Sequence, residues 1–132
     1  MPEELRPGLR GEATTTVDES NLASSYGPAA APVYGTPAMI ALMENAAINA
    51  VDHLLPSGSA TVGTRLDVCH LAATPPGLEV RARAELTEVD GRRLVFRVEA
   101  FDSAEKVGEG THERFITDLN RLVSRAQAKL PA

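Results

Sequence analysis

Glu44 is the residue whose place in the sequence most clearly suggests chemistry. Residues 37–55, PAMIALMENAAINAVDHLL, are predicted to form one long helix. The polar face of that helix carries Asn45, Asn49, Asp52 and His53. Glu44 lies instead on the apolar side, where a carboxylate is costly unless it is paired or used. Glu44 is therefore a candidate for catalysis.

Thr36 and His70 are the other side chains that could act with a carboxylate. Thr36 precedes Pro37 as a predicted N-cap, and its hydroxyl and the free backbone N–H groups there favour negative charge. His70 lies on the apolar side of an alternating segment, residues 60–72, and could orient a carboxylate or carry a proton. The predicted common face of that segment carries Val62, Thr64, Leu66, Val68 and His70.

Each of these residues also has a plainer interpretation. Thr36 could serve only as an N-cap, His70 could be a hydrogen-bonded core histidine, and Glu44 could form an intersubunit ion pair. Arg114 could pair with an acidic group, hold a dimer together or bind a substrate anion. The spacing of the three histidines suggests no metal site.

The composition is that of one globular, weakly acidic domain spanning residues 1–132. The net charge of −5, the lack of a long basic run and the absence of Trp argue against a nucleic-acid partner. A single cysteine, Cys69, excludes an internal disulfide and favours a cytoplasmic location. The first residues lack the apolar segment of a secretory signal, and no apolar run reaches membrane-spanning length, so no membrane partner is expected.

The elements that must position these side chains are one helix and a run of strands. A first strand is predicted at residues 8–17, followed by a long Gly/Pro/Ser-rich loop at 18–35 of the kind that often forms a binding element. Four more strands are predicted at 60–72, 78–89, 93–101 and 106–118, and the tail adds a short helix. This order predicts an α+β architecture, with one long central helix wrapped by a curved antiparallel sheet.

Three further side chains receive structural interpretations. Cys69 alternates with His70, so it points to the other side and is predicted to be a small buried residue. His112 shares a face with Arg114 and is expected to be packed or exposed rather than catalytic. His53 is expected to be solvated.

The order and spacing of the motifs resemble the fluoroacetyl-CoA thioesterase-like family of small hotdog-fold acyl-CoA thioesterases. That family has a Thr eight residues before a helix Glu, as in TPAMIALME, and a His before a PPG turn, as in GTRLDVCHLAATPPG. A late strand carries a segment like GTHER, found here at residues 110–114. The resemblance extends from about residue 33 to 117 and implies the hotdog fold.

The resemblance also implies a site and an assembly. It assigns Thr36, Glu44 and His70 to one acyl-thioester site, and it matches Gly63 to a family glycine near the reacting carbonyl. It implies a homodimer whose sheets join, with the sites in clefts at the subunit interface. No cofactor is expected, because CoA is part of the substrate. The segment SSYGPAAAPVYG departs from fluoroacetyl-specific enzymes, which carry Phe side chains where this chain has two Tyr.

The expected function is hydrolysis of short acyl-CoA thioesters to the acid and free CoA, with Glu44 as nucleophile or general base. The alternative is a non-catalytic hotdog module that binds an acyl-CoA, although such a module gains little from a carboxylate on an apolar face. A hotdog hydratase is disfavoured, because its Asp–His pair occurs only as Asp52–His53 on the polar face.

Overall fold

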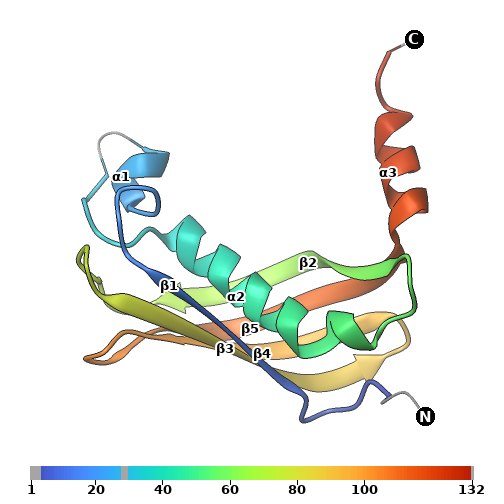
Figure 1. Cartoon of the computed structure of the whole chain (residues 1–132), viewed down its shortest axis with the longest axis horizontal. Coiled ribbons are helices and arrows are strands. Elements are labelled where there is room, and N and C mark those ends of the chain that lie inside the picture. Colours follow the sequence, from blue (N-terminus) through green and yellow to red (C-terminus); the bar gives the residue numbers. More distant parts are fainter. Residues whose placement is uncertain (1–3, 28–29, 132) are drawn as a thin grey trace.

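The computed structural model describes residues 4–27 and 30–131, in which a curved antiparallel sheet wraps one long helix (Figure 1). The strands are β1 (Arg10–Thr16), β2 (Ser59–His70), β3 (Glu79–Asp90), β4 (Arg93–Phe101) and β5 (Lys106–Asp118). The helices are α1 (Ala23–Tyr26), α2 (Thr36–Val51), the 3-10 turn η1 (Asp52–Leu54) and α3 (Leu119–Gln127). The sheet order is β1-β3-β4-β5-β2, so β1 and β2 form its two edges. The predicted α+β architecture is confirmed.

Strand alternation determines which face of the sheet meets α2. The inward side chains of β3 are Val80, Ala82, Ala84 and Leu86, all of which are buried. Charged residues occupy the outward positions between them, so this face is left to solvent. Gly91, at φ 61°, closes the tight β3–β4 turn that the Asp-Gly pair predicts.

The long helix α2 lies toward one side of the sheet, chiefly against β1 and β3. Its buried residues are Ala38, Met39, Leu42, Met43, Ala46, Ala47, Ala50 and Val51. Four of these residues are alanines, whose small side chains let the sheet approach the helix closely. Gly11 of β1 accordingly passes directly over the backbone of Ala46 and Ala50. The inner surface of β2 is consequently less covered by the helix, and it is this surface that carries the polar residues described below.

The start of α2 corrects the predicted cap. Gly35, which has no side chain to cap the helix, is the N-cap, Thr36 is the first helical residue and Pro37 the second. The Thr36 hydroxyl does not cap the helix but forms a hydrogen bond with His70. The observed helix is also shorter at its C-terminal end than the predicted one, since its α-helical part ends at Val51.

A β-bulge in β2 corrects the predicted common face. The register of β2 on β5 shifts between Gly63 and Arg65, so Thr64 is an extra residue in its strand. Val62 pairs with the exposed Phe115, whereas Leu66 pairs with the buried His112, so the two residues lie on opposite faces of the sheet. The prediction that Val62 and Leu66 share a face is wrong. The extra residue brings Gly63 onto the inner face, although it stands an odd number of residues before His70.

Two other predictions concern β2 and the loop before α2. Cys69 does point away from His70's face, but it is exposed, because the outer face of this edge strand is not covered. The loop at 18–35 contains the short helix α1, which the sequence did not predict, and its buried residues Leu22 and Tyr34 tie it to the core. None of the helices in the described ranges is both long and apolar enough to cross a membrane.

Replacing Gly11 with Ala tests the close approach of β1 to α2. A Cβ at this position would overlap the backbone of Ala46 and Ala50, neither of which can move without shifting the helix. We expect Gly11→Ala to lower the free energy of unfolding by about 1–3 kcal/mol in urea titrations. Gly27→Ala is the matched control, since a Cβ there meets open space. Equal stability of the two variants would contradict the packing described here.

Candidate active site

The start of α2 meets the end of β2 through a hydrogen bond between two of the predicted site residues. Thr36 Oγ1 lies 2.8 Å from His70 Nδ1. Tyr34, which the sequence did not single out for the site, lies beside them with its ring edge-on to the imidazole at 6.4 Å between centroids. An open pocket of about 350 Å³ adjoins this group and is lined by Ala23, Val33, Tyr34, Thr36, His70, Leu71, Ala72 and Ala73.

Two polar atoms of this group are buried and unpaired. Tyr34 Oη and His70 Nε2 have no hydrogen-bond partner within the described part of the chain. Burial raises the pKa of Tyr34 to about 12, so its phenol is protonated and available as a donor at neutral pH. Burial also lowers the pKa of His70, which favours the neutral imidazole, the form able to accept a proton. A buried polar atom without a partner is costly, so this corner is suited to a polar ligand.

Glu44 forms an ion pair with Arg114, the second group of the site. Arg114 Nη1 donates to Glu44 Oε2 at 3.1 Å. The Arg114 side chain is only 4% exposed, whereas that of Glu44 is 35% exposed. The ion pair lies within one chain. It leaves part of the carboxylate accessible on the side of α2 that faces β2.

Arg114 is held in place from three sides. Its Nε donates to Thr61 Oγ1 at 2.7 Å, its Nη2 donates to Thr61 O at 2.8 Å, and its Nη1 also lies 3.2 Å from His112 Nε2. Thr61 in turn donates through Oγ1 and N to the carboxylate of Asp52, at 2.6 and 3.1 Å. Asp52 is therefore not simply solvated, because it links the end of α2 to the residue that anchors Arg114.

His112 is a supporting residue that sequence reasoning did not assign to the site. It is fully buried, stacks at a tilt near Phe96, and its Nδ1 lies 2.8 Å from Arg65 O. Because Arg65 O and the Arg114 guanidinium can only accept and donate respectively, the proton belongs on Nδ1 and Nε2 accepts. Burial, followed by the charge of Arg114, lowers the pKa of His112 and keeps it neutral. The sequence signal that could have indicated this role is the two-residue spacing of His112 and Arg114, which places both side chains on one face of a strand.

Gly63 lets the Glu44 carboxylate approach the backbone of β2 closely. A Cβ at this position would lie 2.5 Å from Glu44 Oε2, 3.2 Å from His112 Cε1 and 3.3 Å from Arg114 Nη1. Any larger residue would displace the carboxylate or the guanidinium. Gly63 thus belongs to the same group as Glu44, as the β2 bulge requires.

The five predicted site residues form two groups in one chain. Thr36 lies with His70, and Glu44 lies with Gly63 and Arg114. Thr36 and Glu44 are eight residues apart on α2, a rise of about 12 Å along the helix axis. Among the residues that the structure describes, no hydrogen bond joins the two groups, and no cluster of three or more His, Cys, Asp or Glu could hold a metal ion.

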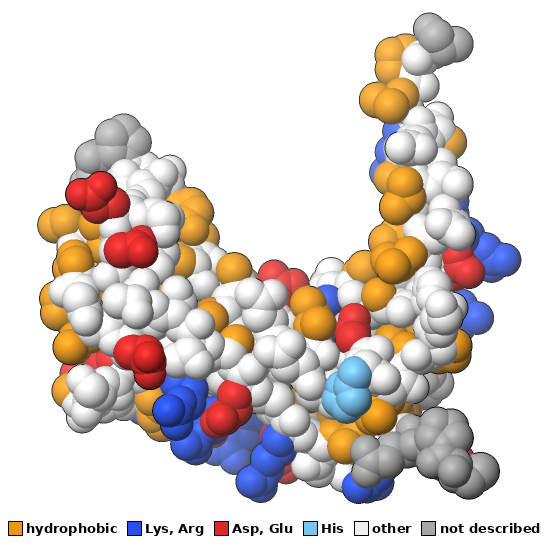
Figure 2. Space-filling model, viewed as in Figure 1, with side chains coloured by type: hydrophobic (Ala, Val, Ile, Leu, Met, Phe, Trp, Pro, Cys, Tyr) orange, Lys and Arg blue, Asp and Glu red, His pale blue; other side chains and the backbone are white. Residues whose placement is uncertain are grey.

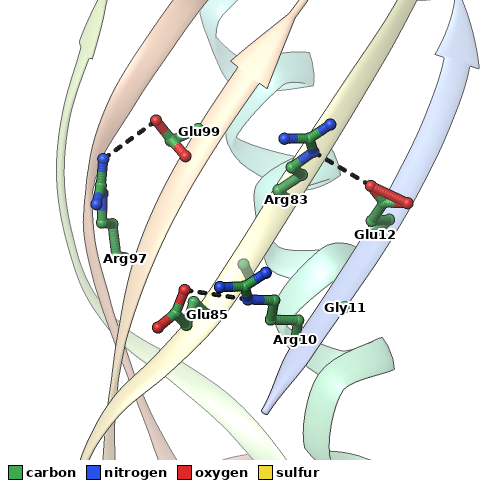
Figure 3. Close-up of a pocket in the computed structure, with 8 residues that line it drawn as sticks. Arg10, Gly11, Glu12, Arg83, Glu85, Arg97 and Glu99 are labelled. Carbon is green, nitrogen blue, oxygen red and sulfur yellow. Dashed lines mark hydrogen bonds and ion pairs between the residues drawn. The ribbon is translucent and has the colours of Figure 1, made fainter. Parts of the chain in front are cut away.

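A larger pocket of about 480 Å³ lies on the outer face of the sheet, away from both groups (Figure 3). Each arginine that lines it is paired with a glutamate, in the pairs Arg10–Glu85, Arg83–Glu12 and Arg97–Glu99. These exposed pairs neutralise one another and contribute little to stability. The pocket therefore offers no unbalanced charge to an anionic ligand.

The chain has several relatives among known proteins. Residues 17–120 match the family described as fluoroacetyl-CoA-specific thioesterase. The fluoroacetyl-CoA thioesterase of Streptantibioticus cattleyicolor is 44% identical over 100 residues, covering 76% of this chain and 72% of that protein. A structure of the fluoroacetyl-CoA thioesterase FlK has a TM-score of 0.92 at 36% identity, covering 98% and 100% of the two chains. A hot-dog-like protein from Thermanaerovibrio acidaminovorans has a TM-score of 0.85 at 26% identity, covering 96% and 93%.

These matches define the protein as a thioester hydrolase with the hotdog fold, in agreement with the sheet-wrapped helix and the motifs in the sequence. More narrowly, the chain belongs to the family of fluoroacetyl-CoA-specific thioesterases. The family resemblance drawn from the TPAMIALME, GTRLDVCH and GTHER segments is thereby confirmed.

Stability should decrease as the pH falls from 7.5 to 5.5. The pKa of buried His112 is lowered in the folded protein, so the unfolded chain binds the proton more readily below its ordinary pKa of 6.5. Acidification therefore favours unfolding through this window. We expect the free energy of unfolding of His112→Gln to depend less on pH than that of the wild type, as measured by urea titration. His53→Gln, at an exposed position, is the control. Parallel profiles for the wild type and His112→Gln would refute this role.

Proposed function

We propose that the protein hydrolyses short acyl-CoA thioesters to the carboxylic acid and free CoA. The observation that carries the proposal is the Glu44 carboxylate, partly exposed and fixed by a buried arginine close against Gly63. The family match supports the reaction class. Variants of FlK have been solved in complex with acetyl-CoA and with fluoroacetate and CoA, which supports a CoA thioester as the substrate here.

Glu44 is proposed as the group that starts the reaction. Arg114 binds Oε2, so Oε1 remains for the substrate carbonyl carbon or for a water molecule. As a nucleophile, Glu44 would form an anhydride and release the CoA thiolate, and water would then cleave the anhydride. As a general base, Glu44 would take a proton from the attacking water. Both routes place the reacting carbonyl at the exposed part of the Glu44 carboxylate.

The bulge and the first turn of α2 are proposed to stabilise charge. A bulge leaves backbone groups outside the regular ladder, and the N–H groups around Thr64 are suited to bind the developing oxyanion. Neutral His70 is proposed to accept the proton released by the attacking water and to pass it to the departing CoA thiolate, with Thr36 orienting the imidazole through its 2.8 Å contact. Arg114 is proposed as a positioning residue for Glu44 with secondary contact to substrate.

A homodimer is proposed to bring the two groups of the site together. β2 is an edge strand, and two apolar side chains near it are exposed in the single chain: Leu66 on its inner face, and Phe115 on the outer face of the neighbouring strand β5. Two-fold antiparallel pairing of two β2 strands would move each Gly63–Glu44 group toward His70 and Thr36 of the partner subunit. Such a site would be shared between subunits.

The competing function is binding of an acyl-CoA without hydrolysis. A panel of acyl-CoA esters distinguishes the two, with loss of thioester absorbance measured directly. If a thiol reagent is used for detection, the assay needs the Cys69→Ser variant, since Cys69 is exposed and would react. Binding of acyl-CoA with no released CoA would favour the binding module.

Glu44→Gln should abolish most of the activity while preserving the shape of the side chain. Loss of the base or nucleophile should lower kcat by roughly 100-fold or more. The control is Glu105→Gln, a charge-neutralising change at an exposed position outside the site. A folded Glu44→Gln protein with unchanged turnover would remove Glu44 from the mechanism.

His70→Ala should impair the chemical step more than substrate binding. His70 is proposed to handle a proton rather than to anchor the ligand, so kcat should fall by about 10²-fold or more with a small change in KM. Steady-state kinetics with an acyl-CoA measures both values. A raised KM with intact kcat would instead make His70 a binding residue.

A further inference from the structure

The C-terminal helix α3 stands away from the rest of the chain (Figure 1). None of its residues is buried, although Leu119, Leu122 and Val123 form an apolar stripe that continues to Leu130. The helix is well defined at its start, where the Asp118 side chain accepts a hydrogen bond from Arg121 N. A lone helix of nine residues is marginal in water, and an apolar stripe of this kind normally packs against a partner.

The opposite end of the molecule carries a surface that complements α3. Tyr26 of α1 is 57% exposed and Leu71 is 52% exposed, and Leu71 lines the Thr36–His70 pocket together with Ala23 of the same short helix. We call this apolar area the Tyr26–Leu71 surface. Figure 2 shows α1 and α3 as two arms that rise on the same side of the sheet, with a hollow between them.

The charges of the two arms are also complementary. Arg121, Arg125 and Lys129 follow one another at helical spacing along one flank of the α3 stripe, all exposed. Asp18 and Glu19, both exposed, precede α1. A basic flank on one arm and acidic residues on the other fit two copies of the chain packed head to tail at these arms.

The topology of β2 carries the α3 arm of one copy to the α1 arm of another. Ser59, at the start of β2, pairs with Asp118, the residue directly before α3, whereas His70 ends β2 beside Leu71. Antiparallel pairing of two β2 edges sets the start of one strand beside the end of the other. The α3 helix of the partner subunit is thereby brought to the end of β2 where the Tyr26–Leu71 surface lies.

We propose that α3 docks on the Tyr26–Leu71 surface of a second copy of this chain and closes the outer wall of that copy's Thr36–His70 pocket. This inference rests on the homodimer in the proposed function. It adds a swapped C-terminal arm to the β2 interface and makes each pocket depend on residues of the other chain. The open pocket of the single chain would become enclosed, with less water around the thioester.

Cysteine cross-linking tests the contact directly. In a Cys69→Ser background, Tyr26→Cys and Val123→Cys are combined in one chain and oxidised mildly at micromolar concentration. The two positions lie on opposite arms of one chain, so a disulfide between them joins two chains and doubles the mass on a non-reducing gel. Each single-cysteine variant is the control. A double variant that gives no more covalent dimer than the controls, while sedimentation shows a dimer, would overturn the docking of α3.

Charge substitution tests the effect on the pocket. Leu122→Glu combined with Val123→Glu places two carboxylates on the docking stripe, at positions exposed in the single chain. We expect KM for an acyl-CoA to rise at least tenfold, with a dimer retained through β2. Asn120→Glu combined with Ser124→Glu makes the same charge change on another face and should leave KM unchanged.

Three results separate the inference from the proposed function. An active wild-type dimer with unchanged KM in the Leu122→Glu/Val123→Glu variant overturns the α3 inference alone. A fully active wild-type monomer overturns the dimer and the inference together. Binding of the wild type to vesicles of anionic phospholipid, lost in the Leu122→Glu/Val123→Glu variant whose KM is unchanged, would assign the stripe to a lipid surface and overturn the inference.

Discussion

The buried guanidinium of Arg114 is the constraint on which the site depends. A charge taken out of water must be paired and hydrogen-bonded, and Arg114 meets this requirement through Thr61, His112 and Glu44. These partners come from β2, β5 and α2, so one side chain ties the helix to two strands at the far side of the sheet. The same bonds determine where the Glu44 carboxylate points and which nitrogen of His112 carries its proton.

The bulge at Thr64 is the second constraint, because it decides which residues of β2 face the helix. Without an extra residue, Gly63 and His70 would lie on opposite faces of the strand. With it, both face inward, and the Glu44 carboxylate packs against the one β2 position that has no side chain. The odd spacing between Gly63 and His70, which does not fit a regular strand, therefore allows both residues to face the helix.

Much of this arrangement could be predicted from the sequence, and the exceptions have physical reasons. Strands β3 and β4 follow from inward apolar residues at alternate positions and from an Asp-Gly turn, and Glu44 was noticeable because it breaks the apolar face of α2. The bulge could not be predicted, since Thr64 is an ordinary strand residue. Asp52 looked solvated because helical periodicity does not reveal that Thr61 of β2 crosses beside it. Tyr34 was missed because an aromatic residue in a loop is readily explained by hydrophobic packing, and the sequence does not show where its hydroxyl lies.

The position of α2 explains why the candidate catalytic groups are only partly covered in a single chain. The helix lies toward β1 and β3, so Glu44 is partly exposed on the β2 side of α2. On the same side, His70 and Tyr34 each keep a buried polar atom that has no partner among the described residues. A surface with an oriented carboxylate, unpaired donors and exposed apolar neighbours is costly to leave facing water. In the proposed dimer the cost is offset from two directions, by β2 pairing along the edge and by the two α3 arms at its ends. Catalysis and assembly would then depend on the same uncovered strand.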